Sequence, residues 1–331
     1  MVEVTRPVLQ RGQVLVKVLA SGVCRSQLME VQGLRGEDRW LPHLLGHEGV
    51  GVVEATGPGV TKVHEGDRVI LGWIAGEGID ADPPVFFTTR GEVINAGRVT
   101  TFSEYTVVSE NRVYLAPDSL GDKAAVLFGC ALLTGAGMVL NETPLEPGQS
   151  VLVSGAGGVG LAALLALVAL GVSPIVADPD PEKREMARVL GASHTFDPLS
   201  QGESSDFQSR FPNGVDIAID ASGTVSAMEF AFQSIKYEGG LLLFASHPPV
   251  GEFMKLEPHE LIRGKQIRGS WGGASQPDRD IAVIADLVMS RRLDLEFMTP
   301  YSYTLDEINT ALKDLEMGKG IRPLIRMNVD E

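Results

Sequence analysis

Two patterns of hydrophobic positions divide the chain near residue 130. Before that point, short apolar runs stand between glycines and polar turns, at residues 15–22, 49–57, 67–73 and 102–109. Short apolar or alternating runs between turn residues are typical of β-strands. The pattern therefore predicts a mainly β domain over residues 1–130.

Beyond residue 130, short apolar runs alternate with longer segments of helical periodicity. The predicted strands are 150–153, 174–177, 215–222, 241–246 and one within 261–271, and the predicted helices are 161–170, 181–191 and 225–240. Strands that alternate with helices indicate a parallel sheet covered by helices, an α/β fold, over residues 131–271. Residues 272–331 mix helical and extended patterns, and the pattern alone assigns this tail to neither domain.

Glycines punctuate the most apolar part of the chain. Residues 151–177 carry no charge and could span a bilayer by length, but glycines and a proline break them into strand, turn, helix and strand. Gly155, Gly157 and Gly160 follow the first strand in GxGxxG spacing, which permits a tight turn, close approach of a pyrophosphate and close helix packing. The segment predicts dinucleotide binding, with Gly158 and Val159 in the same loop.

Two strand ends add side chains to this predicted cofactor site. Asp178 follows the strand 174–177 and lies 23 residues after Gly155, where a carboxylate accepts hydrogen bonds from a ribose 2′-hydroxyl and repels a 2′-phosphate. This position predicts NAD(H) in preference to NADP(H). His247 follows the strand 241–246, and such strand ends face the ligand crevice, so His247 is a further candidate.

The charge balance narrows the range of partners. The chain has 28 Lys and Arg against 43 Asp and Glu, a formal net charge of −15. An acidic surface repels nucleic acid and anionic membranes, so we expect a small-molecule substrate and neither of those partners. Two widely separated cysteines form no disulfide framework and no signal-peptide pattern follows Met1, so we expect a cytoplasmic protein.

Three residues could together hold a metal. Cys24 and Cys130 offer thiolates and His47 offers an imidazole, a donor set that leaves one position open on a tetrahedral zinc ion. Such a zinc ion acts as a Lewis acid on an oxygen ligand. Taken singly, each residue has a strong alternative explanation in core packing, since a single Cys in an apolar segment is more often a core residue than a ligand. The three are also too far apart in sequence for a metal-binding signature.

The motifs in combination resemble one family. SGVCRSQ, GHEGVGVV, GDRVI, FGCALLTGAG and SGAGGVG occur in this order along nearly the whole chain, which resembles the zinc-dependent medium-chain alcohol dehydrogenases. The resemblance implies a GroES-like catalytic domain at 1–130, a Rossmann domain with a doubly wound parallel sheet at 131–271, and a return to the catalytic domain at 272–331. It also implies a homodimer or homotetramer.

The resemblance also implies roles for single residues. Hydride moves between an alcohol and NAD at one catalytic zinc ion per chain, giving an aldehyde or ketone. The zinc ligands would be Cys24, His47 and Cys130, with Glu48 as an occasional ligand or a neighbour of the metal; Ser26 would relay the proton and Trp73 would form a wall of the substrate pocket. Arg25 and Arg322 would contact the cofactor pyrophosphate, and Lys183 would lie near the adenosine ribose.

The sequence departs from the family pattern at several places. Gln27 stands where the family usually has an aspartate, and Met29 stands where some members have a histidine of the proton relay. Residues 73–105 contain no cysteine, so we expect no structural zinc. Cys24 comes early in the chain compared with the family, so we expect the first strand of the catalytic domain to be short or missing. These changes leave the substrate open, with polyols and sugar-derived alcohols as one class.

Two other functions remain as alternatives. One is a zinc-independent quinone or enoyl-type reductase of the same superfamily, against which Cys24, His47 and Cys130 together argue. The other is a non-catalytic NAD(H)-binding sensor, which the changes at Gln27 and Met29 keep open, since a fold and a motif do not prove chemistry.

Overall fold

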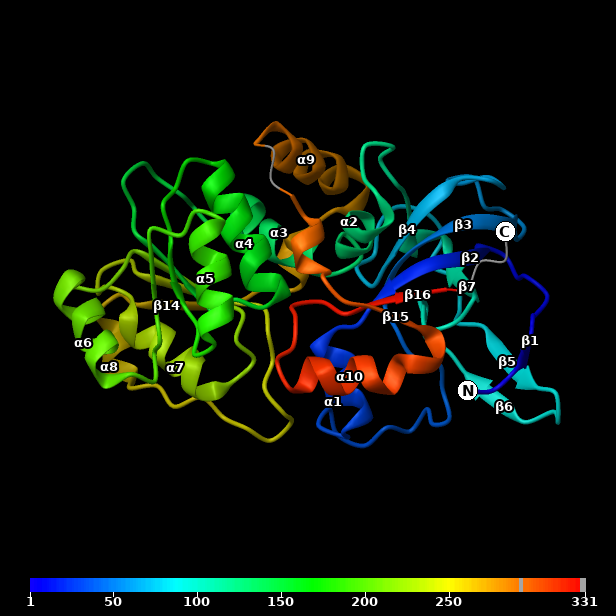
Figure 1. Cartoon of the computed structure of the whole chain (residues 1–331), viewed down its shortest axis with the longest axis horizontal. Helices are drawn as coiled ribbons and strands as arrows, with labels where there is room; N and C mark the ends of the chain where they lie inside the picture. The colour runs from blue at the N-terminus through cyan, green and yellow to red at the C-terminus, as the bar shows by residue number, and fades with distance from the viewer. Residues whose placement is uncertain (292–293, 328–331) are drawn as a thin grey trace. The chain divides into compact units, whose positions relative to one another are not determined.

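The computed structural model describes residues 1–291 and 294–327 (Figure 1). Contacts divide the chain into unit 1, made of Met1–Cys130, Gln276–Ala285 and Asp294–Glu331, and unit 2, made of Ala131–Ser275 and Asp286–Leu293. Residues 292–293 and 328–331, which belong to the predicted tail 272–331, lie outside the described residues. Each unit has its own sheet and core.

Unit 1 is organised by a seven-stranded sheet. Its strand order is β15-β16-β2-β3-β4-β8, with β7 paired to β2 off this path. The strands are β2 (Gln13–Gly22), β3 (Glu48–Thr56), β4 (Arg68–Gly72), β7 (Tyr105–Ser109), β8 (Val113–Leu115), β15 (Ser302–Thr304) and β16 (Leu324–Arg326). Two strands from the end of the chain thus complete a sheet that begins near its start.

The alternation of β2 explains the core of unit 1. Val14, Val16 and Val18 are fully buried on one face of this strand and pack in one cluster with Ile325 of β16. Successive side chains of a strand point to opposite faces, so every second apolar residue reaches this core. The mainly β character predicted for this part of the chain is confirmed.

Smaller elements surround this sheet. A second, three-stranded sheet has the order β1-β5-β6, with β1 (Val4–Thr5), β5 (Val85–Thr88) and β6 (Val93–Asn95). The helices of unit 1 are α1 (Arg25–Val31), α2 (Asp122–Leu127) and α10 (Ile308–Glu316), and α9 (Pro277–Ser290) belongs partly to each unit. α1 and α2 matter most for function, because each lies next to a predicted metal ligand.

Unit 2 contains a parallel sheet of the predicted α/β type. Its strand order is β11-β10-β9-β12-β13-β14, and every pair of neighbours is parallel. The strands are β9 (Val151–Ser154), β10 (Ile175–Ala177), β11 (His194–Phe196), β12 (Ile217–Asp220), β13 (Leu241–Phe244) and β14 (Gln266–Gly269). The order reverses between β9 and β12, and ligands of doubly wound sheets bind at such a point.

α3 (Ala131–Gly137) precedes the first strand of this sheet. The helices that connect the strands are α4 (Gly158–Ala169), α5 (Pro181–Val189), α6 (Gln201–Arg210), α7 (Val225–Ser234) and α8 (Pro258–Ile262). α4 is apolar almost all round, because nine of its twelve residues are buried. Among the described residues, no helix is both long and apolar enough to cross a membrane.

Candidate metal centre and cofactor site

Strand pairing brings the three predicted metal ligands together. β2 and β3 are antiparallel, with Ser21 opposite Gly49, so Cys24 after the end of β2 lies near His47 before the start of β3. Cys130 arrives from the end of α2. One ligand atom from each of the three residues lies within 4.8 Å of the others.

The three residues fit a zinc ion. His47 Nε2 is buried and has no hydrogen-bond partner among the described residues, which is costly for a polar atom unless it binds a ligand. A hydrogen bond with Cys130 lowers the pKa of Cys24 well below its usual range, and Arg322 and His47 lower it further. Two sulfurs and one imidazole nitrogen are a common donor set for catalytic zinc.

The other edge of the His47 ring is also held. His47 Nδ1 contacts the side-chain amide of Gln27 and lies 3.4 Å from Ser26 Oγ. Gln27 is buried, and its Oε1 also accepts a hydrogen bond from the backbone N–H of Cys24 at 3.1 Å. The first turn of α1 therefore lies against both Cys24 and His47. A histidine that binds metal through Nε2 carries its proton on Nδ1, for which Ser26 Oγ is an acceptor, whereas the amide nitrogen of Gln27 is itself a donor.

A buried ion pair lies beside the cluster. Glu48 Oε1 is 2.9 Å from Arg322 Nη1, with side-chain exposures of 0% and 4%. Burial raises the pKa of Glu48 to about 7, although Arg322 opposes this shift. Arg322 precedes β16, whose Leu324 pairs with Gly22 of β2, and this register places the guanidinium beside the cluster. In this structure Arg322 therefore forms an ion pair with Glu48, and it also hydrogen-bonds to Cys24.

The remaining residues predicted in unit 1, Arg25, Ser26 and Trp73, differ in exposure. Arg25 is exposed at the start of α1, and Ser26 is half-buried. Trp73 is half-buried and packs against the core cluster of unit 1. Its backbone N–H donates to Gly129 O at 3.4 Å, which joins the end of β4 to the residue before Cys130.

The glycine loop of unit 2 has the predicted geometry at each glycine. Gly155 has φ +91°, in the left-handed region, and a Cβ there would lie 2.8 Å from Ser222 Cα. A Cβ on Gly160 would lie 1.8 Å from the carbonyl oxygen of Gly155. Gly157 has open space around it and is the N-cap of α4, while Gly158 and Val159 begin that helix. The helix N-terminus therefore offers its N–H groups to an anion.

Asp178 lies immediately after β10 and next to this loop. Its Oδ2 accepts a hydrogen bond from the backbone N–H of Ala156 at 2.7 Å, and its Oδ1 accepts one from Asp180 at 2.9 Å. Lys183 Nζ is 3.6 Å from Asp180 Oδ2, so it lies in the neighbouring turn of α5. His247 is exposed and follows the end of β13.

Sequence reasoning missed a buried carboxylate at the same edge of the sheet. Asp220 ends β12, is fully buried, and contacts Ser222 and Ser246. The only sequence signal was an acidic residue at the end of an apolar strand and before a serine and glycine.

Unit 1 contains a second group of residues of the types that bind metals, Glu30, Asp38 and His43. His43 Nε2 lies 2.7 Å from Asp38 Oδ2 and 3.7 Å from Glu30 Oε1, while His43 Nδ1 lies 2.7 Å from Leu44 O. Burial lowers the pKa of His43, but the hydrogen bonds that its ring donates to Leu44 O and to the Asp38 carboxylate raise it above the usual value. An imidazolium that donates from both nitrogens accounts for this group.

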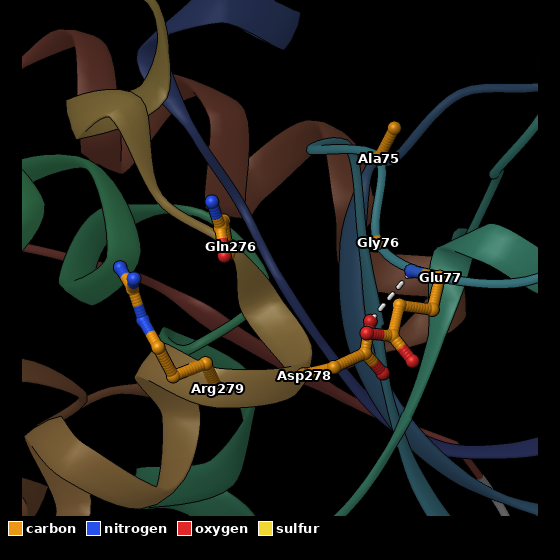
Figure 2. A pocket seen from close by; sticks show the side chains of 6 residues that line it. All are labelled: Ala75, Gly76, Glu77, Gln276, Asp278 and Arg279. Carbon is orange, nitrogen blue, oxygen red and sulfur yellow. Dashed lines mark hydrogen bonds between the residues drawn. The ribbon is translucent and has the colours of Figure 1, made fainter.

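A small pocket also lies in unit 1, away from the predicted ligands. It measures about 240 Å³ and is lined by Ala75, Gly76, Glu77, Gln276, Asp278 and Arg279. Figure 2 shows the Asp278 carboxylate turned towards the backbone N–H of Glu77, which donates to it at 2.6 Å. The volume is below that of most ligand pockets, and none of the predicted site residues lines it.

Models of known protein families match both the β domain and the nucleotide-binding part of the chain. Residues 10–118 match the family model of the alcohol dehydrogenase GroES-like domain, and residues 158–288 match that of the zinc-binding dehydrogenases. The alcohol dehydrogenase class-3 of Myxine glutinosa is 30% identical over 98% of this chain and 93% of its own length. The chain belongs to the zinc-dependent medium-chain alcohol dehydrogenase family.

Other relatives agree with this membership. An S-(hydroxymethyl)glutathione dehydrogenase of Escherichia coli O1:K1 / APEC is 30% identical over 96% of this chain and 93% of its own. The crystal structure of benzyl alcohol dehydrogenase from Acinetobacter calcoaceticus has a TM-score of 0.85 at 26% identity, covering 98% of this chain and 94% of that one. The predicted enzyme class, a zinc- and NAD-dependent alcohol dehydrogenase, and the predicted fold are confirmed, and the zinc-independent and sensor alternatives are not favoured.

Proposed function

We propose that this family member oxidises alcohols with NAD at a single catalytic zinc site made by Cys24, His47 and Cys130, and that it carries no structural zinc. The observation that supports this most directly is the unpartnered, buried Nε2 of His47 beside two thiols. When bound, zinc supplies a Lewis acid for the alcohol oxygen and NAD supplies the hydride acceptor.

The residues of the chain have separate tasks in this proposal. Ser26 and Gln27 lie against Nδ1 of the His47 imidazole, and the hydroxyl of Ser26 would relay the proton that the alcohol releases, accepting it while passing its own proton on to water. Glu48 provides an additional carboxylate beside the ligands, held by Arg322. Trp73 forms a wall of the substrate pocket.

The cofactor residues belong to the same proposal. The loop of Gly155, Gly157, Gly158, Val159 and Gly160 binds the pyrophosphate, helped by Arg25 and Arg322. Asp178 and Lys183 bind the adenosine ribose, and His247 lies near the nicotinamide. We further propose the boundaries 1–130, 131–271 and 272–331 for the first catalytic part, the nucleotide-binding domain and the returning catalytic part.

Two properties of the whole protein follow from single features. Cys24 and Cys130 are free and adjacent, so an oxidising compartment would favour a disulfide over metal binding, and we propose the cytoplasm. β14 ends the sheet of unit 2, and its outer edge can pair with a second copy to give a homodimer or homotetramer.

Elemental analysis of purified protein tests the zinc site. We expect about one zinc per chain in the wild type and in His64→Asn, whose side chain is 82% exposed, and almost none in Cys24→Ala or Cys130→Ala, while all four bind NADH. A zinc-free wild type that still reduces a substrate would overturn the proposal. Turnover is then screened with benzyl alcohol, S-(hydroxymethyl)glutathione and polyols. The names of two relatives contain the first two compounds, and the sequence leaves polyols open as a third class.

A further inference from the structure

A buried carboxylate joins the ends of three neighbouring strands in unit 2. Asp220 is the last residue of β12, and its register partners are Ser154 at the end of β9 and Phe244 at the end of β13. Asp220 has no exposed surface. It therefore lies buried at the carboxyl ends of these three strands, where the loops that follow them begin.

Serine hydroxyls surround this carboxylate. Ser222 Oγ donates to Asp220 Oδ1 at 2.8 Å, and Ser246 Oγ donates to Oδ2 at 3.2 Å. Ser154, which precedes the first glycine of the fingerprint, also hydrogen-bonds to it. Ser246 Oγ in turn accepts the backbone N–H of Gly223 at 2.9 Å, so one carboxylate fixes the segments after β12 and β13.

These segments form one side of the expected cofactor crevice. The strand order reverses between β9 and β12, and Gly155 packs directly against Ser222. Asp178 on the β10 side is the proposed ribose ligand of the adenosine half. The other half of a bound dinucleotide would then extend across the reversal point, towards the ends of β12 and β13.

An uncharged side chain would occupy this buried position at a lower cost in free energy. Burying a carboxylate is unfavourable, and here burial raises the pKa of Asp220 although the serine hydroxyls oppose it. Its donors Ser154, Ser222 and Ser246 are neutral, so the negative charge is not balanced by them. The nicotinamide ring is positively charged in NAD⁺ and neutral in NADH, and a nearby buried anion stabilises the first form more than the second.

We propose that Asp220 is a positioning residue of the nicotinamide half of the cofactor site, which fixes the two loops through Ser222 and Ser246 and whose charge favours NAD⁺ over NADH. This inference rests on the proposed NAD-dependent function. It assigns to Asp220 two separable effects, one geometric and one electrostatic.

Cofactor binding by three variants separates these effects. In Asp220→Asn we expect the dissociation constant of NAD⁺ to rise on the order of tenfold more than that of NADH, because only NAD⁺ carries a ring charge that loses its attraction to the carboxylate. In Ser246→Ala, which keeps the charge and releases Gly223, both constants should rise by a similar factor of several-fold. Asp216→Asn is the matched control, because Asp216 precedes the opposite end of β12 and pairs with Lys236, and its ratio of constants should equal the wild-type ratio.

The measurements are calorimetry for NAD⁺ and fluorescence titration for NADH on the full chain, with circular dichroism to verify folding. Wild-type affinities for both forms in Asp220→Asn would overturn this inference alone. If that variant does not fold, unchanged affinities in Ser246→Ala would overturn it equally. A wild-type protein that binds neither form would overturn both this inference and the proposed function.

Discussion

Replacing Gly160 by alanine tests the packing of the glycine loop. The added Cβ would stand 1.8 Å from the carbonyl oxygen of Gly155, whereas ordinary contact begins at 3.4 Å, so loop and helix must separate by about 1.6 Å. Overpacking of this kind costs about 1–3 kcal/mol or more, and the higher helix propensity of alanine returns at most about 1 kcal/mol. We expect a net loss of about 2 kcal/mol, or about 4–8 °C in the melting temperature of unit 2.

Gly157→Ala is the matched control in the same loop. Nothing lies within 4 Å of a Cβ at Gly157, and its φ of −80° suits alanine, so the melting temperature should stay unchanged. Its NADH affinity should fall, because the methyl group would occupy space that the pyrophosphate needs. Thermal unfolding followed by circular dichroism, with NADH titration, measures both quantities. A Gly160→Ala protein that melts with the wild type would refute the packing argument.

Three further predictions concern charge and core packing. Arg322→Met leaves Glu48 buried without its cation and should lower the free energy of unfolding, measured in urea, by about 3–5 kcal/mol. The double variant with Glu48→Gln should recover most of this loss. Equal losses in the single and the double variant would contradict the prediction. Burial raises the pKa of Asp216, but Lys236 and Ser150 outweigh burial and lower this pKa to about 2. The ionised carboxylate therefore contributes ~2 kcal/mol to the free energy of unfolding above about pH 4, and this contribution disappears as the pH falls towards 2. The stability difference between wild type and Asp216→Asn should narrow over that interval in urea titrations, and a constant difference would count against the ion pair. Phe207→Ala should cost about 3–5 kcal/mol and the exposed Gln208→Ala almost nothing in thermal unfolding; similar melting points would show that Phe207 is not core.

The sequence pattern predicted best where apolar runs and glycines coincide. The predicted strand 150–153 and helix 161–170 correspond to β9 and α4, although α4 begins earlier, at Gly158. The sequence pattern predicts a turn at these glycines, but two of them, Gly158 and Gly160, lie within α4. β11 and α6 were missed, because β11 has three residues at the edge of the sheet and α6 is polar except for Phe207.

The candidate site was predictable as residues but not as an arrangement. Cys24, His47 and Cys130 carry no mutual spacing signal, and only the antiparallel register of β2 and β3 explains why the first two meet. The ion pair of Glu48 with Arg322 depends on β16 pairing with β2, a contact between the two ends of the chain that local periodicity does not encode. Asp220 was missed because burial of an acid at a strand end is a property of the folded sheet.

The division of unit 1 into three chain segments has a consequence for its biosynthesis. β2 leaves the ribosome before unit 2 is translated, but β16, its neighbour in the sheet, is translated only after every strand of unit 2. Unit 2 is nearly continuous, so its sheet can close while translation still proceeds. The nascent β-domain must therefore wait with residues 20–22 of β2 unpaired on one side and without Arg322 beside Glu48. A premature stop codon before β15 would yield a chain that contains all the proposed metal ligands but lacks two strands of this sheet.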